Sequence, residues 1–254
     1  MQSTAQTDPS RTPPRVVVVA AMEEELHSLR QRLSEVERVD STVGLAVRGL
    51  LESEEVLLIA TGEGSVAAEK GLSALLSGQN IEVLLVVGVA GAISPDLAVG
   101  DLVAVDSVRD KRGKIPSPDA SLLQRALTSD NVVQGGVVSV DTIVVDAAAK
   151  RALWQSVGGG PFQVVDLESA TYARLAAERG IPYFVLRAVS DTASESLPLD
   201  FNEFRSLDGS IDRGKVARHL IFHPHLLGPL KGLRTRLREC AVSMADVVEG
   251  ILKS

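Results

Sequence analysis

Short runs of aliphatic residues alternate with helical stretches along most of this chain, and that alternation limits its fold most strongly. The first run, Val16–Ala20, is almost entirely β-branched and is typical of a strand buried on both faces. Leu26, Leu29 and Leu33 then recur at helical spacing over residues 23–33. The same patterns predict strands over 46–50, 56–60, 83–87, 99–105, 137–140, 163–165 and 183–189, and helices over 66–76, within 116–130, over 147–155, 167–179 and, with breaks at Pro224 and near Gly228-Pro229, over 212–252.

Strands that alternate with helices predict an α/β fold with a largely parallel central sheet covered by helices. We find no linker and no internal repeat, so residues 16–254 are expected to form a single catalytic domain. Residues 1–15 are polar and contain three prolines, and we expect them to form a disordered tail.

Composition narrows the classes of function. Apolar residues make up 45% of the chain and aromatic residues only 3%, so Val, Leu, Ile and Ala dominate the expected core. The formal net charge of -7 argues against a nucleic-acid binder with a basic face. The longest uncharged aliphatic run, residues 83–93, is too short to span a bilayer. With one cysteine, Cys240, and no apolar leader near the N-terminus, we expect a cytoplasmic protein.

Carboxylates follow three of the predicted strands. Asp191 ends the last strand, Asp166 and Glu168 follow the strand before it, and Glu23–Glu25 follow the first. The carboxyl ends of parallel strands lie along one edge of a sheet, where ligands bind in open α/β folds. We therefore expect one acidic, concave site for acid/base work on a small molecule. The same edge should also hold Gly62–Gly64, Gly88–Gly91 and Asp141.

Each of these acids also has a purely structural interpretation. Asp191 would serve well as a helix N-cap, whereas burial would favour its protonated form, which a general acid needs. Acids in the first turn of a helix, such as Glu23–Glu25, are favoured by the helix dipole and are commonly only solvated. The residues alone leave both interpretations open.

Two glycine-rich turns invite a nucleotide-binding interpretation. Gly62–Ala67 fits G-x-G-x-x-A between a strand and a helix, but the next strand ends without the acid that a dinucleotide site requires. We therefore favour a tight turn there. Gly88–Gly91 contains no Ser, Thr, Arg or Lys that would complete an anion site. We expect Val89, Ala90 and Gly91 to form the floor beneath an uncharged ligand.

The C-terminal part is basic and rich in leucine. Seven Lys or Arg and no acid lie between Arg213 and Arg238, a pattern that favours an amphipathic helical tail over contact with an anionic membrane surface. Pro224 separates His223 from His225, and no acid or cysteine lies nearby, so no metal site is predicted.

Five motifs occur in order: Ala20-Ala-Met-Glu-Glu-Glu25, Gly62-Glu-Gly-Ser-Val-Ala-Ala68, Gly88-Val-Ala-Gly91 before Val99-Gly-Asp101, Val165-Asp-Leu-Glu-Ser169 and Val189-Ser-Asp191. Together they resemble the nucleoside phosphorylase/nucleosidase superfamily, and within it the methylthioadenosine/S-adenosylhomocysteine nucleosidases, over residues 16–204. The resemblance implies a three-layer α/β/α sandwich with a mixed, largely parallel sheet that is partly barrel-like. It also implies homodimers or larger assemblies, a nucleoside substrate, and no metal or organic cofactor.

The resemblance further implies a role for each site residue. Asp191, supported by Ser190, would protonate N7 of the leaving purine. Glu25 would hold and polarise the attacking water, and Glu168 would accept hydrogen bonds from the ribose 2′- and 3′-hydroxyls. The remaining contacts would be Leu167 beside the ribose, Ile143 and the main chain of Val144 at the base, Phe201 at the 5′ substituent, and the floor formed by Val89, Ala90 and Gly91.

Departures from the family pattern bear on the activity. Val89 stands where phosphorylases of this superfamily carry a Ser or Thr for phosphate, and Glu25 would repel phosphate. These residues favour hydrolysis of 5′-substituted adenine nucleosides over phosphorolysis, which is the alternative. Ile143 replaces the aromatic residue expected to stack on adenine, which leaves the identity of the base open.

The C-terminal segment, residues 207–237, resembles instead the hopanoid-associated branch, which acts on an adenosyl-lipid. A phosphorylase or nucleosidase for such a lipid is therefore a further alternative. A nucleoside-binding protein without turnover is the non-enzyme alternative, although binding alone does not require several acids around one ligand.

Overall fold

A computed structural model describes residues 16–39, 44–76, 81–206 and 210–253. The tail expected over residues 1–15 lies outside the described residues, as does part of the 207–237 segment. The strands are β1 (Val16–Ala20), β2 (Ser34–Arg38), β3 (Ala46–Leu51), β4 (Glu54–Ala60), β5 (Val83–Ala92), β6 (Leu102–Asp110), β7 (Gly113–Lys114), β8 (Val132–Ser139), β9 (Gln163–Asp166) and β10 (Tyr183–Asp191). The helices are α1 (Glu23–Arg32), α2 (Ser65–Leu76), α3 (Ala120–Ala126), α4 (Ala147–Ser156), α5 (Ser169–Glu178), α6 (Arg213–Phe222) and α7 (Leu227–Lys253), with short 3-10 turns η1 (Phe201–Phe204) and η2 (Pro224–Leu226).

The described strands form one mixed sheet, in the order β10-β6-β8-β9-β5-β1-β4-β3-β2, with β7 beside β6. A further pairing of β10 with β5 closes β10, β6, β8, β9 and β5 into a ring. The strands β4, β1, β5 and β10 run parallel to one another, so their carboxyl ends share one edge. Antiparallel pairs occur at the outer strands β2–β3–β4 and within the ring, at β10–β6 and β5–β9. The result is a partly barrel-like α/β sheet.

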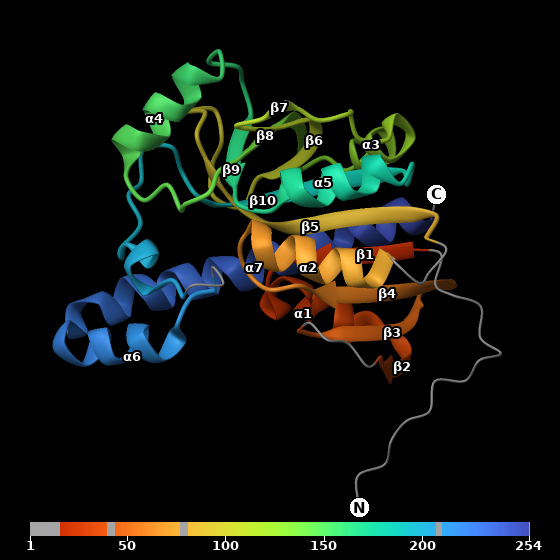
Figure 1. Ribbon diagram of the computed structural model, residues 1–254, viewed down its shortest axis with the longest axis horizontal. Coiled ribbons are helices and arrows are strands. Elements are labelled where there is room, and N and C mark those ends of the chain that lie inside the picture. The colour runs from red at the N-terminus through yellow and green to blue at the C-terminus, as the bar shows by residue number, and fades with distance from the viewer. Residues whose placement is uncertain (1–15, 40–43, 77–80, 207–209, 254) are drawn as a thin grey trace, which may run out of the picture.

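Helices cover both faces of this sheet, because successive side chains of a strand point to opposite sides. Val17 and Val19 of β1 pack in one core cluster with residues of α2 and α5. Val16 and Val18 pack in the other with residues of α1, α3 and α7. Figure 1 shows α2 and α5 in front of the sheet and α7 behind it, which gives the expected three layers.

Several element boundaries differ from the sequence-based expectation. The strand β5 continues through Gly88–Gly91, where a turn was expected, and β10 runs on to Asp191. The helix α5 starts at Ser169 and not at Leu167, so Glu168 precedes it. The helix α7 contains Pro229, because proline is tolerated in a first turn, where its missing N–H would have no intrahelical acceptor.

The two C-terminal helices form a hairpin of unequal burial. The second half of α7 packs into the core through residues such as Met244 and Val248, whereas no residue of α6 is buried. Figure 1 shows α6 and the start of α7 projecting beside the body of the molecule. The expected helical tail is therefore packed only at its end. Across the described residues, every helix is either too short or too polar to cross a membrane.

Candidate active site

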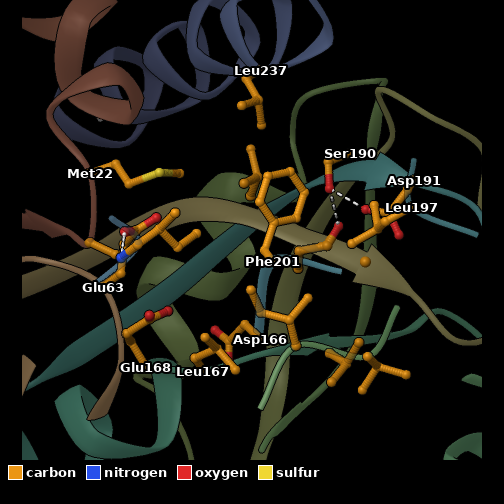
Figure 2. Close-up of a pocket in the computed structure, with 18 of the residues that line it drawn as sticks. Met22, Glu63, Asp166, Leu167, Glu168, Ser190, Asp191, Leu197, Phe201 and Leu237 are labelled. Atoms are coloured by element: carbon orange, nitrogen blue, oxygen red, sulfur yellow. Dashed lines mark hydrogen bonds between the residues drawn. The ribbon is translucent and has the colours of Figure 1, made fainter. Parts of the chain in front are cut away.

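A pocket of about 370 Å³ lies at the edge where β1, β5 and β10 end. This volume is in the range of small-molecule sites. In Figure 2, Leu167 and Glu168 lie on one side of the pocket and Ser190 and Asp191 on the other, with Phe201 between them. The lining includes every site residue predicted from the sequence: Glu25, Val89, Ala90, Gly91, Ile143, Val144, Leu167, Glu168, Ser190, Asp191 and Phe201.

Glu25 is held at both carboxyl oxygens by main-chain donors. It occupies the first turn of α1, and its Oε2 accepts a hydrogen bond of 2.8 Å from the N–H of Met22. Its Oε1 accepts one of 2.8 Å from the N–H of Val89 in β5. Burial raises the pKa of Glu25, and the guanidinium of Arg187 and these two N–H groups oppose that rise only in part. The carboxyl group is therefore fixed, buried and a stronger base than an exposed glutamate.

Glu168 enters the pocket from the residue before α5. Its side chain does not cap that helix, but its Oε1 accepts a hydrogen bond of 2.6 Å from the N–H of Gly64. Burial, with the charge of Asp166 beside it, raises the pKa of Glu168 to about 8. The protonated form of this carboxyl group is therefore more favoured than in an exposed glutamate.

The buried cation Arg187 ties the acids of this side together. Its Nη2 lies 2.7 Å from Oδ2 of Asp166, and its Nε and Nη2 donate to the hydroxyl of Ser169 at 3.0 and 2.9 Å. Burial works against the charge of Arg187, but Asp166, Glu25 and Glu168 outweigh it and raise the pKa of the guanidinium. Asp166 is therefore the ion-pair partner of Arg187. The acidic residues around this one cation are three: Asp166, Glu25 and Glu168.

Gly88 makes room for this arrangement. It pairs with Arg187 across β5 and β10. A Cβ atom at Gly88 would lie 2.7 Å from Oε1 of Glu25 and would overlap the guanidinium of Arg187. Gly88, the first residue of the glycine-rich segment Gly88–Gly91, thus allows charged side chains to approach closely.

Asp191 has a partner on each oxygen. Ser190 donates its hydroxyl to Oδ1 at 2.6 Å, and the ammonium of Lys150 forms an ion pair with Oδ2. From the sequence, we expected burial alone to determine whether Asp191 is protonated. The residue is indeed buried, but α4 supplies a cation that the sequence interpretation omitted, and Asp191 does not cap a helix.

The base side of the pocket is lined by the segment after β8. The side-chain amide of Asn202 pairs with both main-chain groups of Ile143, accepting from its N–H and donating to its C=O, each at 2.9 Å. Among the described residues, the main-chain N–H and C=O of Val144 have no hydrogen-bond partner. This leaves the main chain of Val144 available to a polar ligand edge.

Apolar side chains of the C-terminal hairpin line one part of the pocket, which we call its mouth, and the lining also includes the charged residues Glu63, Arg205 and Arg213. Val216 of α6 and Leu233 and Leu237 of α7 line it, together with Ile211. The main-chain N–H of Ile211 donates to Glu63 at 3.0 Å, which connects this segment to the turn after β4. The leucine spacing that predicted an amphipathic helix did not reveal this role.

One expected member of the site lies elsewhere. Asp141 follows β8, but its exposed side chain pairs with Lys111 at 2.6 Å outside this pocket. Its neighbour Val140 lines the pocket, so the end of β8 does reach the site and only the side chain of Asp141 lies outside it, beside Lys111.

Three further residues of the site were missed: Lys150, Arg187 and Asn202. Arg187 gave a usable signal, since an arginine within an otherwise apolar strand needs a buried acid as its partner. Lys150 gave only the weak signal of one lysine after three alanines. Over the described part of the chain, no group of three or more His, Cys, Asp or Glu is arranged to hold a metal ion.

Residues 15–221 match the family model of the phosphorylase superfamily. Two curated relatives named 5′-methylthioadenosine/S-adenosylhomocysteine nucleosidase are each 29% identical to this chain. The relative from an Exiguobacterium species aligns over 214 residues, which cover 75% of this chain and 90% of the relative. The one from Listeria monocytogenes aligns over 215 residues, which cover 74% and 90%.

Solved structures show the same fold. The MTA/SAH nucleosidase of Streptococcus pneumoniae, in complex with 8-aminoadenine, superposes with a TM-score of 0.73 at 22% identity, covering 94% of this chain and 99% of that one. The nucleosidase of Neisseria meningitidis, in complex with methylthio-immucillin-A, gives 0.71 at 21% identity, covering 94% and 98%. At these identities the likeness concerns the fold.

Proposed function

The chain belongs to the phosphorylase superfamily, and from that premise we propose that it hydrolyses the N-glycosidic bond of 5′-substituted adenine nucleosides and releases adenine. The observation that carries the proposal is the placement of buried acids around one pocket, with Asp191 on one side, Glu168 on the other (Figure 2) and Glu25 in the same lining. The names of the curated relatives support the same substrate class.

The chemistry of the bond explains why such a site needs acids on both sides. Cleavage of the C1′–N9 bond builds positive charge on the ribose and negative charge on the departing base. A proton donor at the base stabilises the leaving group, and carboxylates near the sugar stabilise the cationic centre. A base beyond C1′ orients water for attack, as in inverting glycosidases.

Asp191 is the group we assign to N7 of the purine, with Ser190 fixing its Oδ1. Glu25 is the group we assign to the attacking water, because burial raises its pKa and so makes it a better proton acceptor. Glu168 is assigned to the ribose hydroxyls, and Leu167 to the face of the sugar.

The base and the 5′ substituent have separate surroundings. Val144 offers a main-chain donor and acceptor for the adenine edge, and Ile143 supplies an apolar wall. Phe201 lines the same pocket, and we assign it to the 5′ group together with Leu233 and Leu237 of the mouth. The apolar character of the mouth fits a thioether or a longer apolar substituent, including the adenosyl-lipid alternative.

Phosphorolysis is the less favoured alternative for a physical reason. A phosphate beside β5 would need the N–H of Val89, but that donor is already bonded to Glu25. The nearby guanidinium of Arg187 is paired with Asp166, so the surroundings are negative overall and would repel phosphate. Water needs neither the N–H of Val89 nor a positively charged environment.

Turnover distinguishes this proposal from a nucleoside-binding protein. Replacing Asp191 by Asn keeps the size of the side chain and removes its acid. We expect adenine release to be abolished while binding of methylthioadenosine, measured by calorimetry, is retained. Equal loss of both would indicate that Asp191 has only a structural role.

We also propose an oligomeric state and a cellular location for the protein. Assembly as a homodimer is supported by the family resemblance, and light scattering after size exclusion would measure it. A cytoplasmic location is supported by the single, buried thiol of Cys240, which has no second cysteine in the chain as a disulfide partner.

A further inference from the structure

Lys150 is buried in a way that its helix does not explain. It is the one buried residue of α4, every residue of which the structure describes, and its exposed fraction is 0%. Burial of a lysine costs free energy unless its charge is paired and its N–H groups are bonded. A role outside α4 must therefore account for its position.

The ammonium of Lys150 forms all of its hydrogen bonds within residues 191–195. It contacts Oδ2 of Asp191, the C=O of Thr192 at 2.7 Å and the C=O of Glu195 at 2.8 Å. An ammonium has three donors, so none is left for a ligand. Lys150 is also absent from the pocket lining, which means that any effect on the reaction passes through Asp191.

The contact with Asp191 matters most as the base departs. In its ion pair with Lys150, Asp191 is a carboxylate, so it must take up a proton from solvent before it can act as the acid. When it then gives that proton to N7, its O–H bond breaks, an N7–H bond forms, and the electron pair of the C1′–N9 bond goes to the purine. Asp191 is then a buried carboxylate, and an ammonium at Oδ2 stabilises that charge where it forms. With Ser190 on Oδ1, the carboxyl group is also held at both oxygens.

Resting on the function proposed above, we propose that Lys150 is a positioning residue for cleavage of the glycosidic bond. It fixes Asp191 and the segment 192–195, and it stabilises the carboxylate that Asp191 becomes. Its effect should therefore depend on how much the leaving group needs a proton.

The test compares two leaving groups on Lys150→Met, Lys150→Arg and the wild type. One substrate is methylthioadenosine, and the other is the 4-nitrophenyl β-riboside with the same 5′-methylthio group, whose nitrophenolate departs without a proton. For Lys150→Met we expect kcat for adenine release to fall at least ~100-fold, the scale of general-acid catalysis, with KM changed less than ~3-fold. Nitrophenol release should fall less than ~5-fold, and Lys150→Arg, which keeps the charge, should recover part of the adenine activity.

Arg151→Met is the matched control, since Arg151 is the exposed next residue of α4 and lies outside the pocket lining. It should leave both activities unchanged. Equal losses on both substrates for Lys150→Met, or no loss on either, would overturn the proposal. A wild type that cleaves neither substrate would contradict the proposed function itself, which is a separate outcome.

A second variant pair addresses folding, because Lys150→Met leaves Asp191 buried and unpaired. The double variant Lys150→Met/Asp191→Asn removes both charges. If Lys150 acts only through Asp191, the double variant should match Asp191→Asn in nitrophenol release, which needs no proton, within ~3-fold. A further loss of ~10-fold or more in nitrophenol release would show that Lys150 acts on the structure at large.

Discussion

The main-chain N–H of Val89 donates a hydrogen bond of 2.8 Å to Oε1 of Glu25, which joins the glycine-rich end of β5 to the first turn of α1. The pairing occupies a donor that an anionic co-substrate would need and, at the same time, orients a buried carboxyl group. It thus connects two sequence motifs that lie far apart in the chain, and it favours water as the second reactant.

Replacement of Glu25 by Gln should remove the base that activates water. We expect kcat for adenine release to fall by about 100-fold or more, since general-base catalysis contributes on that scale. The matched control is Glu24→Gln, because Glu24 is its exposed neighbour and pairs with Arg213 at 2.8 Å on the surface. Wild-type turnover by the Glu25 variant, measured by adenine chromatography, would remove Glu25 from the mechanism.

The pH profile should reflect the burial of Glu25. Only the ionised carboxylate can accept a proton, and burial raises the pKa of Glu25 above its ordinary 4.5. The value of kcat/KM should therefore decline on the acidic side at a pH higher than an exposed glutamate would give. Assays from pH 4 to 8, with recovery of activity on return to neutral pH as the control, would measure this. A profile that stays flat down to the ordinary value contradicts the assignment.

Glu168 should make stability depend on pH. Its pKa is raised from 4.5 to about 8, so the folded protein holds a proton that the unfolded chain loses first. This contribution is complete below pH 4.5 and is lost as the pH rises through 8. We expect the Tm of Glu168→Gln to rise relative to that of the wild type between pH 5 and 9. The rise should be about 2–4 °C for each kcal/mol of unfolding free energy that the wild type loses over this range.

Thermal unfolding across that range would measure the Glu168 effect. The exposed Glu178, at the end of α5, provides the control variant Glu178→Gln, whose difference from the wild type should stay nearly constant with pH. A constant difference for Glu168→Gln as well would show that the carboxyl group is ionised in the folded protein throughout.

Gly88→Ala should be strongly destabilising, because the new Cβ overlaps Arg187 and crowds Glu25. We expect a loss of about 1–3 kcal/mol in the free energy of unfolding, together with loss of activity. Gly232→Ala is the control, since nothing lies within 4 Å of a Cβ there and alanine favours the helix α7. Urea unfolding distinguishes the two, and a neutral Gly88→Ala would show that the site tolerates displacement of Arg187.

The sequence predicted the strands that carry the site because their signal is local. β1 is a continuous apolar run, and β10 is apolar except for Arg187 and its last two residues, so each was recognised, and Glu25 and Asp191 were placed at their respective ends. The edge strand β2 was missed, because its Ser-Glu-Val-Glu-Arg sequence is largely exposed and has no apolar face. The glycines of Gly88–Gly91 indicated a turn, but β5 continues through them and pairs with β10. The missing side chain of Gly88 leaves the space that the guanidinium of Arg187 occupies.

The partners of the two buried cations could not be identified from the sequence. Arg187 and Lys150 owe their burial to acids supplied by other elements, Asp166 at the end of β9 and Asp191 at the end of β10. Such pairs depend on the closure of the ring and on the docking of α4, which no local pattern reports. Nor does a local pattern report that the side chain of Asp141 pairs with Lys111 outside the pocket, although Val140 beside it lines the pocket.

Adenine release from methylthioadenosine and S-adenosylhomocysteine, measured by chromatography with and without phosphate, distinguishes hydrolysis from phosphorolysis. For hydrolysis we expect adenine and free 5-substituted ribose to form at the same rate in both conditions. Release that requires phosphate and yields a sugar phosphate would contradict it, and would mean that phosphate displaces Glu25 from the N–H of Val89.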